Sequence, residues 1–432
     1  MKAILFLGTS LVSAQYIKKA TKKLGFQPIF LLKIADYSGD PKQAIELCEH
    51  YEADINSLKD IERVIQQHNL ASRCIAITSL LDETLQYACV IAQKYKLIGP
   101  DPTLSKLTDK TYVQQIISEF SPPSITFDLS NLSDKKITSF IEENNNFNEF
   151  LLKPAISSGA VDIFILDKEI NADLIKNIII KQTQINASKF HRWMLQSRIN
   201  GRLYSLEGFV KDGHINFLGF SRRVRKELTE CINEFPVDED LTDNLKQQCM
   251  QAVAALIQRS NYRNGYFHSE FIIKNLNAYF IDANMGRIAG GAFIHRLSKY
   301  YEIDATDIIT HVIDLGLFKG EHTKSFQYKE KHQGRTLTIN YCLSESALVW
   351  NVTLPSQTTS FHTVVANNGK VIPAIGFNDC AWVGFLAGFK EDVLTEIDHI
   401  IINTNKGPMR PFYVLFEEER EVIEPVKKIN HD

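Results

Sequence analysis

The stretch FHSEFIIKNLNAYFIDANMGR, residues 267–287, decides which fold this chain can adopt. Two runs with apolar residues at every second position, FHSEFII and AYFIDAN, flank the short polar break KNLN, which is the pattern of a β-hairpin. When the two runs are paired, Glu270 falls opposite Asp282 and His268 falls opposite Asn284, all on one face. Two carboxylates that face each other across a sheet repel, so this pair requires a compensating positive charge.

A divalent cation is the simplest compensating charge, because neither carboxylate has a basic residue beside it in the sequence. The carboxylates of Glu270 and Asp282 and the amide oxygen of Asn284 are the ligands that a hard cation prefers. Arg287 follows three residues later, where it can hold an anion beside the metal. The set suits Mg²⁺ (or Mn²⁺) bound to nucleotide phosphates. The alternative is a hairpin with solvated acids, which seldom carries four polar groups in one register.

This pattern resembles the signature of the ATP-grasp superfamily, which has an acid on one strand, an acid-x-Asn on the next and then an arginine. Here it stands as Glu270, then Asp282-Ala283-Asn284, then Arg287. The family usually has glutamate where Asp282 stands. The resemblance implies the mixed α/β ATP-grasp fold, with ATP and Mg²⁺ as cofactors. It also implies that Glu270 contacts both metal and nucleotide, that Asp282 and Asn284 bind the metal, and that Arg287 is a catalytic and substrate-binding residue.

Composition sets limits on the class of protein. At 432 residues, 44% of them hydrophobic, the chain has room for two to four domains with substantial cores. A formal net charge of −3 creates no field that would draw the chain onto nucleic acid or a membrane, and no apolar run reaches transmembrane length. The seven cysteines are scattered and lack a CxxC pair, which favours reduced thiols and a cytoplasmic location over a zinc site or a disulfide framework.

Residues 1–105 alternate short apolar strands with helices, which predicts βαβ units and a parallel sheet. The opening MKAILFLGTSLVSAQ also has features of a signal peptide, but a helical pattern continues through the supposed cleavage site, so we favour a buried first strand. Gly8 alone is not a GxGxxG motif, so no dinucleotide site is expected. The resemblance agrees, since ATP-grasp ligases often carry an N-terminal α/β domain that holds no nucleotide.

Lys110 is the first candidate for holding phosphates. It lies in the early turns of a helix predicted from Ser105 to Phe120. Lysines on helices are usually solvated, so the local sequence favours a surface position. ATP-grasp enzymes, however, commonly place an ATP-contacting lysine after a small residue and an aspartate, and Thr108-Asp109-Lys110 is similar to that arrangement.

The segment FLLKPAISSGAVDIFIL, residues 150–166, predicts two strands joined by a turn of small residues. Lys153 ends the first strand, because the proline after it cannot donate to the sheet. The N–H groups and hydroxyls of Ser157, Ser158 and Gly159 can cradle phosphates, since small side chains let the oxygens come close. The segment resembles the flap that covers the nucleotide in ATP-grasp proteins, although it is poorer in glycine. The resemblance implies that all four residues contact ATP.

The strand that ends at Ile199 resembles the hinge after the ATP-grasp lid, where family members read acid-x-aromatic-aliphatic. Here the positions hold Gln196, Ser197, Arg198 and Ile199. The resemblance implies that Gln196 belongs to the ATP site and that the backbone of Ser197 and Ile199 contacts adenine. Glu207 is the nearest acid for the ribose, unless it belongs to the sheet.

Arginines and glycines mark the remaining candidates. Arg222, Arg223 and Arg225 either neutralise a phosphate or a substrate carboxylate, or they form a solvated strand end, and the sequence leaves both interpretations open. Gly290 and Gly291 allow close backbone approach to a small substrate. Similar runs in ATP-grasp amino-acid ligases border the acyl-phosphate site, which implies a substrate-binding role for both glycines.

The resemblance implies three domains. They are an N-terminal α/β domain at 1–105, an ATP-grasp domain at 106–318 with a mobile lid at about 122–196, and a small C-terminal α+β domain at 319–432. The C-terminal domain shows no catalytic constellation and is expected to shape the pocket or to form an oligomer contact. Within the ATP-grasp domain, residues 242–258 predict a helix that packs behind the hairpin. Its apolar stripe consists of Leu245, Cys249, Ala252, Val253 and Leu256.

Two predictions concern the C-terminal part itself. Asn368-Gly369 between two apolar runs predicts a β-hairpin. The sequence VLTEIDHIIINT, residues 393–404, predicts a helix.

The chain is most similar to carboxylate–amine ligases related to carbamoyl-phosphate synthetase and biotin carboxylase, and especially to L-amino-acid ligases. The resemblance implies an ADP-forming reaction in which a carboxylate attacks the γ-phosphate of ATP and an amine then displaces phosphate from the acyl phosphate. The expected partners are a small carboxylate, such as an amino acid, and an amine, with a homodimer as one option. The alternatives are a bicarbonate-activating carboxylase or synthase of the same superfamily and a nucleotide-binding protein without turnover.

Overall fold

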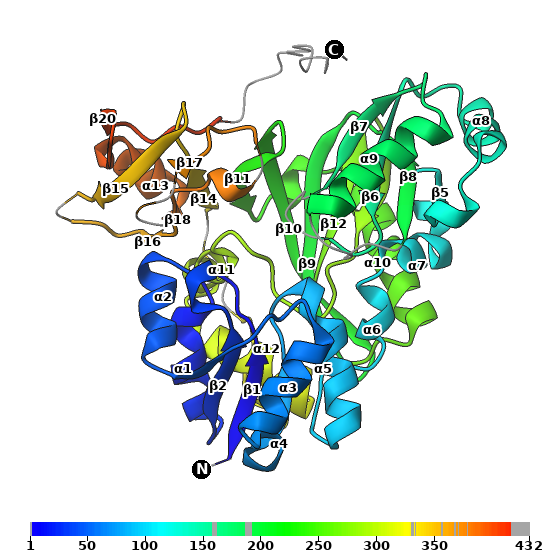
Figure 1. Ribbon diagram of the computed structural model, residues 1–432. Coiled ribbons are helices and arrows are strands. Elements are labelled where there is room, and N and C mark those ends of the chain that lie inside the picture. Colours follow the sequence, from blue (N-terminus) through cyan, green and yellow to red (C-terminus); the bar gives the residue numbers. More distant parts are fainter. Residues whose placement is uncertain are drawn as a thin grey trace.

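A computed structural model describes most of the chain and divides it around a long central sheet (Figure 1). The described residues are 2–157, 162–185, 192–329, 332, 334–355, 357–366, 369, 371–377 and 379–415. In the view of Figure 1 the N-terminal unit lies at the bottom, a small sheet with two helices at the upper right, and the C-terminal strands at the upper left. The strands that carry the predicted site run between these three parts.

The N-terminal unit is the predicted α/β domain. Its parallel sheet has the order β3-β2-β1-β4. The strands are β1 (Ala3–Leu7), β2 (Gln27–Leu32), β3 (Glu49–Glu52) and β4 (Cys74–Thr78). The helices are α1 (Ala14–Lys23), α2 (Gly39–Glu46), α3 (Leu58–Gln67), α4 (Leu70–Arg73) and α5 (Asp82–Tyr95). Every residue of β1 is buried, which confirms the buried first strand.

The central sheet is antiparallel and has the strand order β13-β12-β9-β10-β11-β14-β18-β16. Its strands are β9 (Arg202–Lys211), β10 (His214–Lys226), β11 (Thr229–Phe235), β12 (Gly265–Lys274), β13 (Asn277–Asp282), β14 (Thr336–Tyr341), β16 (Phe361–Val364) and β18 (Gly384–Phe389). The helices that pack on it include α10 (Asp243–Ser260), α11 (Phe293–Tyr301), α12 (Ala305–Phe318) and α13 (Lys390–Glu396). The sheet therefore runs across the predicted boundary between residues 318 and 319.

The predicted lid region folds as a separate small sheet with the order β5-β8-β6-β7. It comprises β5 (Ser124–Phe127), β6 (Glu149–Pro154), β7 (Phe164–Asp167), β8 (Trp193–Ser197) and the helices α8 (Asp134–Glu143) and α9 (Ala172–Ile185). Its own hydrophobic core contains Phe140, Phe150 and Trp193. A sheet with its own core can move as a unit relative to the rest, as a lid requires.

The connection into the lid differs from the prediction. The single helix expected from Ser105 to Phe120 is wrong, because the chain forms two short helices, α6 (Leu104–Leu107) and α7 (Lys110–Ile116). Asp109 separates them, and its side chain accepts the N–H of Thr111 at 2.8 Å as the N-cap of α7. Lys110 is therefore the first residue of a helix.

The outer part of the C-terminal region forms a fourth sheet of order β17-β15-β19-β20. It contains β15 (Ala347–Thr353), β17 (Val371–Ile372), β19 (Ile401–Thr404) and β20 (Gly407–Met409), next to α13 (Lys390–Glu396). The helix predicted at 393–404 is wrong beyond Glu396, since β19 pairs with β15. The runs that flank Asn368-Gly369 belong to different sheets, because β16 pairs with β18 and β17 with β15, and Asn368 itself lies outside the described residues.

Short 3₁₀ helices complete the described structure. They are η1 (Ile34–Asp36), η2 (Ser118–Phe120), η3 (Leu129–Asn131), η4 (Asp238–Asp240), η5 (Asp379–Ala381) and η6 (Ile397–His399). Within the described ranges, none of the helices has the length and apolar character needed to cross a bilayer.

Helix α10 supports the site from behind, and its predicted core stripe is confirmed. Leu256 and the other four stripe residues are buried against β12, β13 and their neighbours. Leu256→Ala should lower the free energy of unfolding by about 2–5 kcal/mol, because it leaves a cavity under the hairpin. Urea denaturation measures the change, and Gln251→Ala on the exposed face of the same helix is the control. Equal midpoints for both variants would show that the stripe does not stabilise the sheet.

Candidate active site

A cavity of about 1210 Å³ is lined by the N-terminal unit, the lid, the central sheet and the C-terminal region. The predicted site residues that line it are Lys110, Lys153, Ser157, Gln196, Ser197, Ile199, Glu270, Asp282, Asn284, Arg287, Gly290 and Gly291. Ser158 and Gly159 lie outside the described residues. The structure thus brings residues predicted from five separate segments to one cavity.

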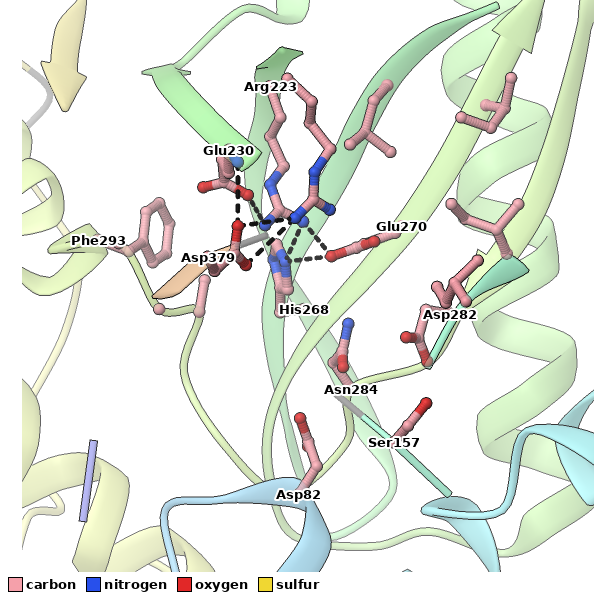
Figure 2. Close-up of a pocket in the computed structure, with 18 of the residues that line it drawn as sticks. Asp82, Ser157, Arg223, Glu230, His268, Glu270, Asp282, Asn284, Phe293 and Asp379 are labelled. Carbon is pink, nitrogen blue, oxygen red and sulfur yellow. Dashed lines mark hydrogen bonds and ion pairs between the residues drawn. The ribbon is translucent and has the colours of Figure 1, made fainter. Parts of the chain in front are cut away.

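The hairpin of β12 and β13 has the predicted pairing at the site but a different one at its turn. Glu270 pairs with Asp282, and the N–H of His268 donates to the carbonyl oxygen of Asn284 at 3.1 Å, as predicted. Between Glu270 and Phe271 the register shifts by one residue, so Phe271 pairs with Phe280, and this irregularity was not predicted. Figure 2 shows Glu270, Asp282 and Asn284 around the cavity, with His268 beside Glu270.

Basic side chains from distant segments compensate the two facing carboxylates. Lys110 forms an ion pair with Asp282, 172 residues away, and Arg223 forms one with Glu270, 47 residues away. Burial opposes the charge on Glu270, but Arg223 and His268 outweigh it and hold the pKa of Glu270 well below its usual value. The two carboxylates lack basic neighbours only in the local sequence. Because Lys110 and Arg223 lie beside them in the fold, charge compensation by itself does not require a metal.

The donor set still fits a magnesium ion. In the described part of the chain, no group of three or more His, Cys, Asp or Glu side chains has the arrangement of a metal site. Mg²⁺ at a nucleotide site needs fewer protein ligands, because one or two carboxylates suffice when phosphate oxygens and waters complete the octahedron. Glu270 and Asp282 provide two carboxylates on adjacent strands, and Asn284 adds an amide oxygen that lines the same cavity.

Arg287 is held by two side-chain partners. Its Nε donates to Asp82 Oδ2 at 2.6 Å, and its Nη2 donates to Asn284 Oδ1 at 2.9 Å. Asp82 begins α5 in the N-terminal unit, and no local sequence pattern indicates its role. The N-terminal unit, from which no nucleotide contact was expected, therefore positions the arginine of the signature.

Lys153 is buried, with 5% of its surface exposed, and it has no hydrogen-bond or ion-pair partner among the described residues. Burial and the nearby charge of Lys110 lower its pKa to about 8. The two lysines approach because the N–H of Lys110 donates to the carbonyl oxygen of Ala155 at 2.8 Å, just after β6. Lys110 is largely buried, with 11% of its side chain exposed, so the surface position that its local sequence favoured is wrong. Burial opposes its charge, but Asp282 outweighs burial and raises the pKa of Lys110.

The hinge residues lie on or just beyond β8, between β5 and β6. The N–H of Ser197 already donates to the carbonyl oxygen of Pro123 at 2.9 Å, so its backbone can offer adenine only its carbonyl oxygen. The Nε2 atom of Gln196 is buried and has no partner among the described residues. Glu207 belongs to the sheet, where it accepts from Ser205 Oγ and contacts His268 Nδ1, both at 2.8 Å, and is not available to a ribose.

The solvated strand end proposed for Arg222, Arg223 and Arg225 is wrong. All three lie on β10 inside the central sheet, and each engages carboxylates. Arg225 Nη2 lies 3.1 Å from Asp379 Oδ1, and Arg222 lies 3.6 Å from a carboxylate oxygen of Glu234. Arg223 reaches both Glu230 and Glu270.

Gly290 and Gly291 precede α11 and line the cavity. Gly291 has a φ of +59°, which favours glycine, and a Cβ there would lie 3.3 Å from Glu230 Oε1. The backbone conformation and the nearby Glu230 therefore favour glycine at position 291, and the close approach of a substrate to both glycines stays a prediction.

Three site residues, Glu230, Asp379 and Trp382, come from parts of the sequence where no such role was predicted. Glu230 is the second residue of β11, and its N–H donates to Asp379 Oδ1 at 3.0 Å. Trp382 Nε1 donates to the carbonyl oxygen of Glu230 at 2.8 Å. Asp379 and Trp382 follow the outer strands of the C-terminal region, so this region shapes the pocket, as one of the two expectations for it stated. No local sequence pattern marks these residues. They reach the cavity because β11 pairs with β14, which joins the C-terminal strands to the rest of the central sheet.

No protein-family model and no curated protein matches the chain. Solved structures do. Phosphoribosylglycinamide synthetase from Anaerococcus prevotii matches with a TM-score of 0.64 at 17% identity, covering 93% of this chain and 99% of that chain. L-amino acid ligase from Bacillus licheniformis matches with a TM-score of 0.69 at 14% identity, covering 93% and 98%.

A third match is the biotin carboxylase domain dimer of 2-oxoglutarate carboxylase from Hydrogenobacter thermophilus, solved with MgADP, ADP and bicarbonate. Its TM-score is 0.68 at 15% identity, and the match covers 94% of this chain and 91% of that chain. These identities are low, but the matches extend over nearly the whole of each chain, so they concern the complete arrangement of parts. The chain has the ATP-grasp fold.

Proposed function

We propose that this protein is a cytoplasmic, ATP-dependent, ADP-forming ligase that joins a small carboxylate to an amine through an acyl phosphate. The observation that carries the proposal is Lys153, a buried lysine with no partner among the described residues, which lines the same cavity as the Glu270–Asp282 pair. A buried cation without a counter-charge is costly unless an anionic ligand compensates it. An unpaired lysine next to paired acids suits a phosphate chain that carries its own metal.

Glu270, Asp282 and Asn284 would hold Mg²⁺ on the phosphates. When bound, the ion would neutralise the negative charge that develops during phosphoryl transfer. The chain itself would position the reactants. Lys110 and Lys153 would hold the phosphates from the lid side.

Arg287 would stabilise the transferred phosphoryl group from the opposite wall, where Asp82 fixes its guanidinium. Gly290 and Gly291 would let the substrate approach the backbone at the same place. No side-chain nucleophile is required, because the substrate carboxylate itself attacks the γ-phosphate.

The solved relatives support this reaction class. One is named as a ligase of L-amino acids, which favours an amino acid as the carboxylate. The biotin carboxylase domain was solved with bicarbonate, which favours bicarbonate activation as the second candidate. A nucleotide-binding protein without turnover would share the lysines and the acids but would release no ADP.

ADP release distinguishes the three candidates. The purified chain is incubated with MgATP and, in turn, with pairs of the twenty common amino acids and with bicarbonate, and a coupled assay follows ADP. We expect ADP release to depend on one amino acid and to rise when an amine partner is added. Release with bicarbonate alone would favour the second candidate. Tight MgATP binding without stimulated release by any panel member would contradict the ligase proposal, and the Lys153→Met variant controls for contaminating ATPases.

A further inference from the structure

Arg223 connects the two ends of the cavity. It lies on β10, inside the central sheet, with 12% of its side chain exposed. Its Nη1 contacts Glu270, the proposed metal ligand, and its Nη2 contacts Glu230, next to Gly291. Figure 2 shows this guanidinium between the two carboxylates, with His268 beside it. Each terminal nitrogen therefore serves a different carboxylate.

The carboxylate of Glu270 is in contact with two basic side chains, Arg223 and His268. Its Oε1 atom already accepts from Arg223 and lies 3.2 Å from His268 Nε2. A divalent cation on the same carboxylate would repel the guanidinium and draw electron density away from that oxygen. Arg223 and the metal cannot both bind Glu270 at full strength, so binding of the metal weakens one of the three contacts that hold Arg223; the other two are with Glu230 and with His268 Nε2, at 3.1 Å.

If the contact of Arg223 with Glu270 weakens, a buried N–H group of Arg223 loses its acceptor. Buried donors need an acceptor, and the Nε atom of Arg223 already has none among the described residues. Arg223 lines the cavity, and a planar guanidinium matches the geometry of a carboxylate better than the point charge of a lysine does. The reacting carboxylate must lie beside the metal-bound phosphate, which is the side of Arg223 that faces Glu270.

We propose that Arg223 binds the carboxylate of the acid substrate and that Glu270 withholds Arg223 until the metal–nucleotide complex has bound. This inference rests on the proposed ligase function and adds an order of binding to it, with MgATP before the acid. The physical benefit is that the carboxylate is recognised only when a phosphoryl donor is present.

The test is the affinity of the full chain for MgADP, measured by isothermal titration calorimetry. Arg223→Gln removes the competitor for Glu270, so we expect MgADP to bind about five- to tenfold more tightly than to the wild type. Lys226→Gln is the matched control, because it removes one positive charge from the same strand at an exposed position that does not line the cavity. That control should bind MgADP as the wild type does. Weaker or unchanged MgADP binding by Arg223→Gln would overturn the inference.

The second measurement uses the acid that stimulates ADP release. Arg223→Gln should raise the KM for this acid about 100-fold, without raising the KM for MgATP. Arg223→Lys keeps the charge but cannot span both carboxylates, so it provides an intermediate KM and replaces the glutamine variant if that variant does not fold. An unchanged KM for the acid in either variant would contradict the role of Arg223.

Failure of this inference can be separated from failure of the proposed function. If the wild-type chain binds no MgADP, or if no acid stimulates ADP release, the ligase proposal fails and the inference fails with it. If the wild type binds MgADP and releases ADP while the Arg223 variants behave like it, only the role of Arg223 is lost.

Discussion

Asp282→Asn is expected to abolish measurable ADP release and to weaken magnesium-dependent nucleotide binding at least about 100-fold. The substitution removes the negative charge from one of the two facing carboxylates and leaves the geometry of the side chain nearly unchanged. An amide is a much poorer ligand for a hard cation than a carboxylate. The measurement is MgADP affinity by calorimetry, with and without Mg²⁺, alongside ADP release.

The same substitution also removes the counter-charge of Lys110, so a loss of stability must be separated from a loss of binding. Breaking a buried ion pair is strongly destabilising, because one charge is left uncompensated. Asp282→Glu is the matched control. It keeps the charge for Lys110 and places at this position the residue that ATP-grasp proteins usually have, so it should retain both stability and ADP release. If Asp282→Asn remains folded and binds MgADP as the wild type does, the metal site proposed here is wrong.

Lys153→Met is expected to weaken nucleotide binding about 100-fold, since it removes a buried cation that has no partner among the residues the structure describes. The pH dependence provides a sharper test. Burial and Lys110 lower the pKa of Lys153 to about 8, so the free protein carries the charge below pH 8 and loses it as the pH rises. Phosphates bind the charged form. Wild-type affinity for MgADP should therefore be constant below pH 8 and fall by up to about tenfold per pH unit above it.

Two variants assign that pH dependence to Lys153. Arginine stays charged over the whole range, so Lys153→Arg should bind MgADP without the loss above pH 8. Lys153→Met should be weak at every pH, with no inflection near 8. An inflection of the same size in Lys153→Met would show that another group titrates, and equal affinities of that variant and the wild type would remove Lys153 from the site.

The hairpin and helix α10 show how much local pattern determines. The alternation of residues 267–287 was sufficient to place Glu270 opposite Asp282, but the shift by one residue between Glu270 and Phe271 was not predicted from it. The stripe on α10 was equally clear, because its period of 3.6 residues continues over four turns. In both cases neighbouring residues carry the information.

The wrong predictions concern residues whose structure depends on contacts with distant parts of the chain. Residues 393–404 have enough helix-forming side chains to predict a helix, but Ile401–Thr404 forms β19 because β15, about 50 residues earlier, offers a free edge. The local sequence around Lys110 predicts an exposed side chain, but its ion pair with Asp282 leaves that side chain largely buried. The division into domains stays a prediction, since β14, β16 and β18 extend the central sheet beyond residue 318.

The sequence by itself indicated the fold class, the pairing of Glu270 with Asp282 and twelve of the residues that line the cavity, because each depends on periodicity or on a short motif. Only the tertiary structure decided which charges face each other. Lys110 with Asp282, Arg223 with Glu270, Asp82 with Arg287 and Asp379 with Arg225 all join segments that are distant in the chain. Ion pairs act over a few ångströms in space, and the order of strands in a sheet, which local sequence does not encode, sets those distances.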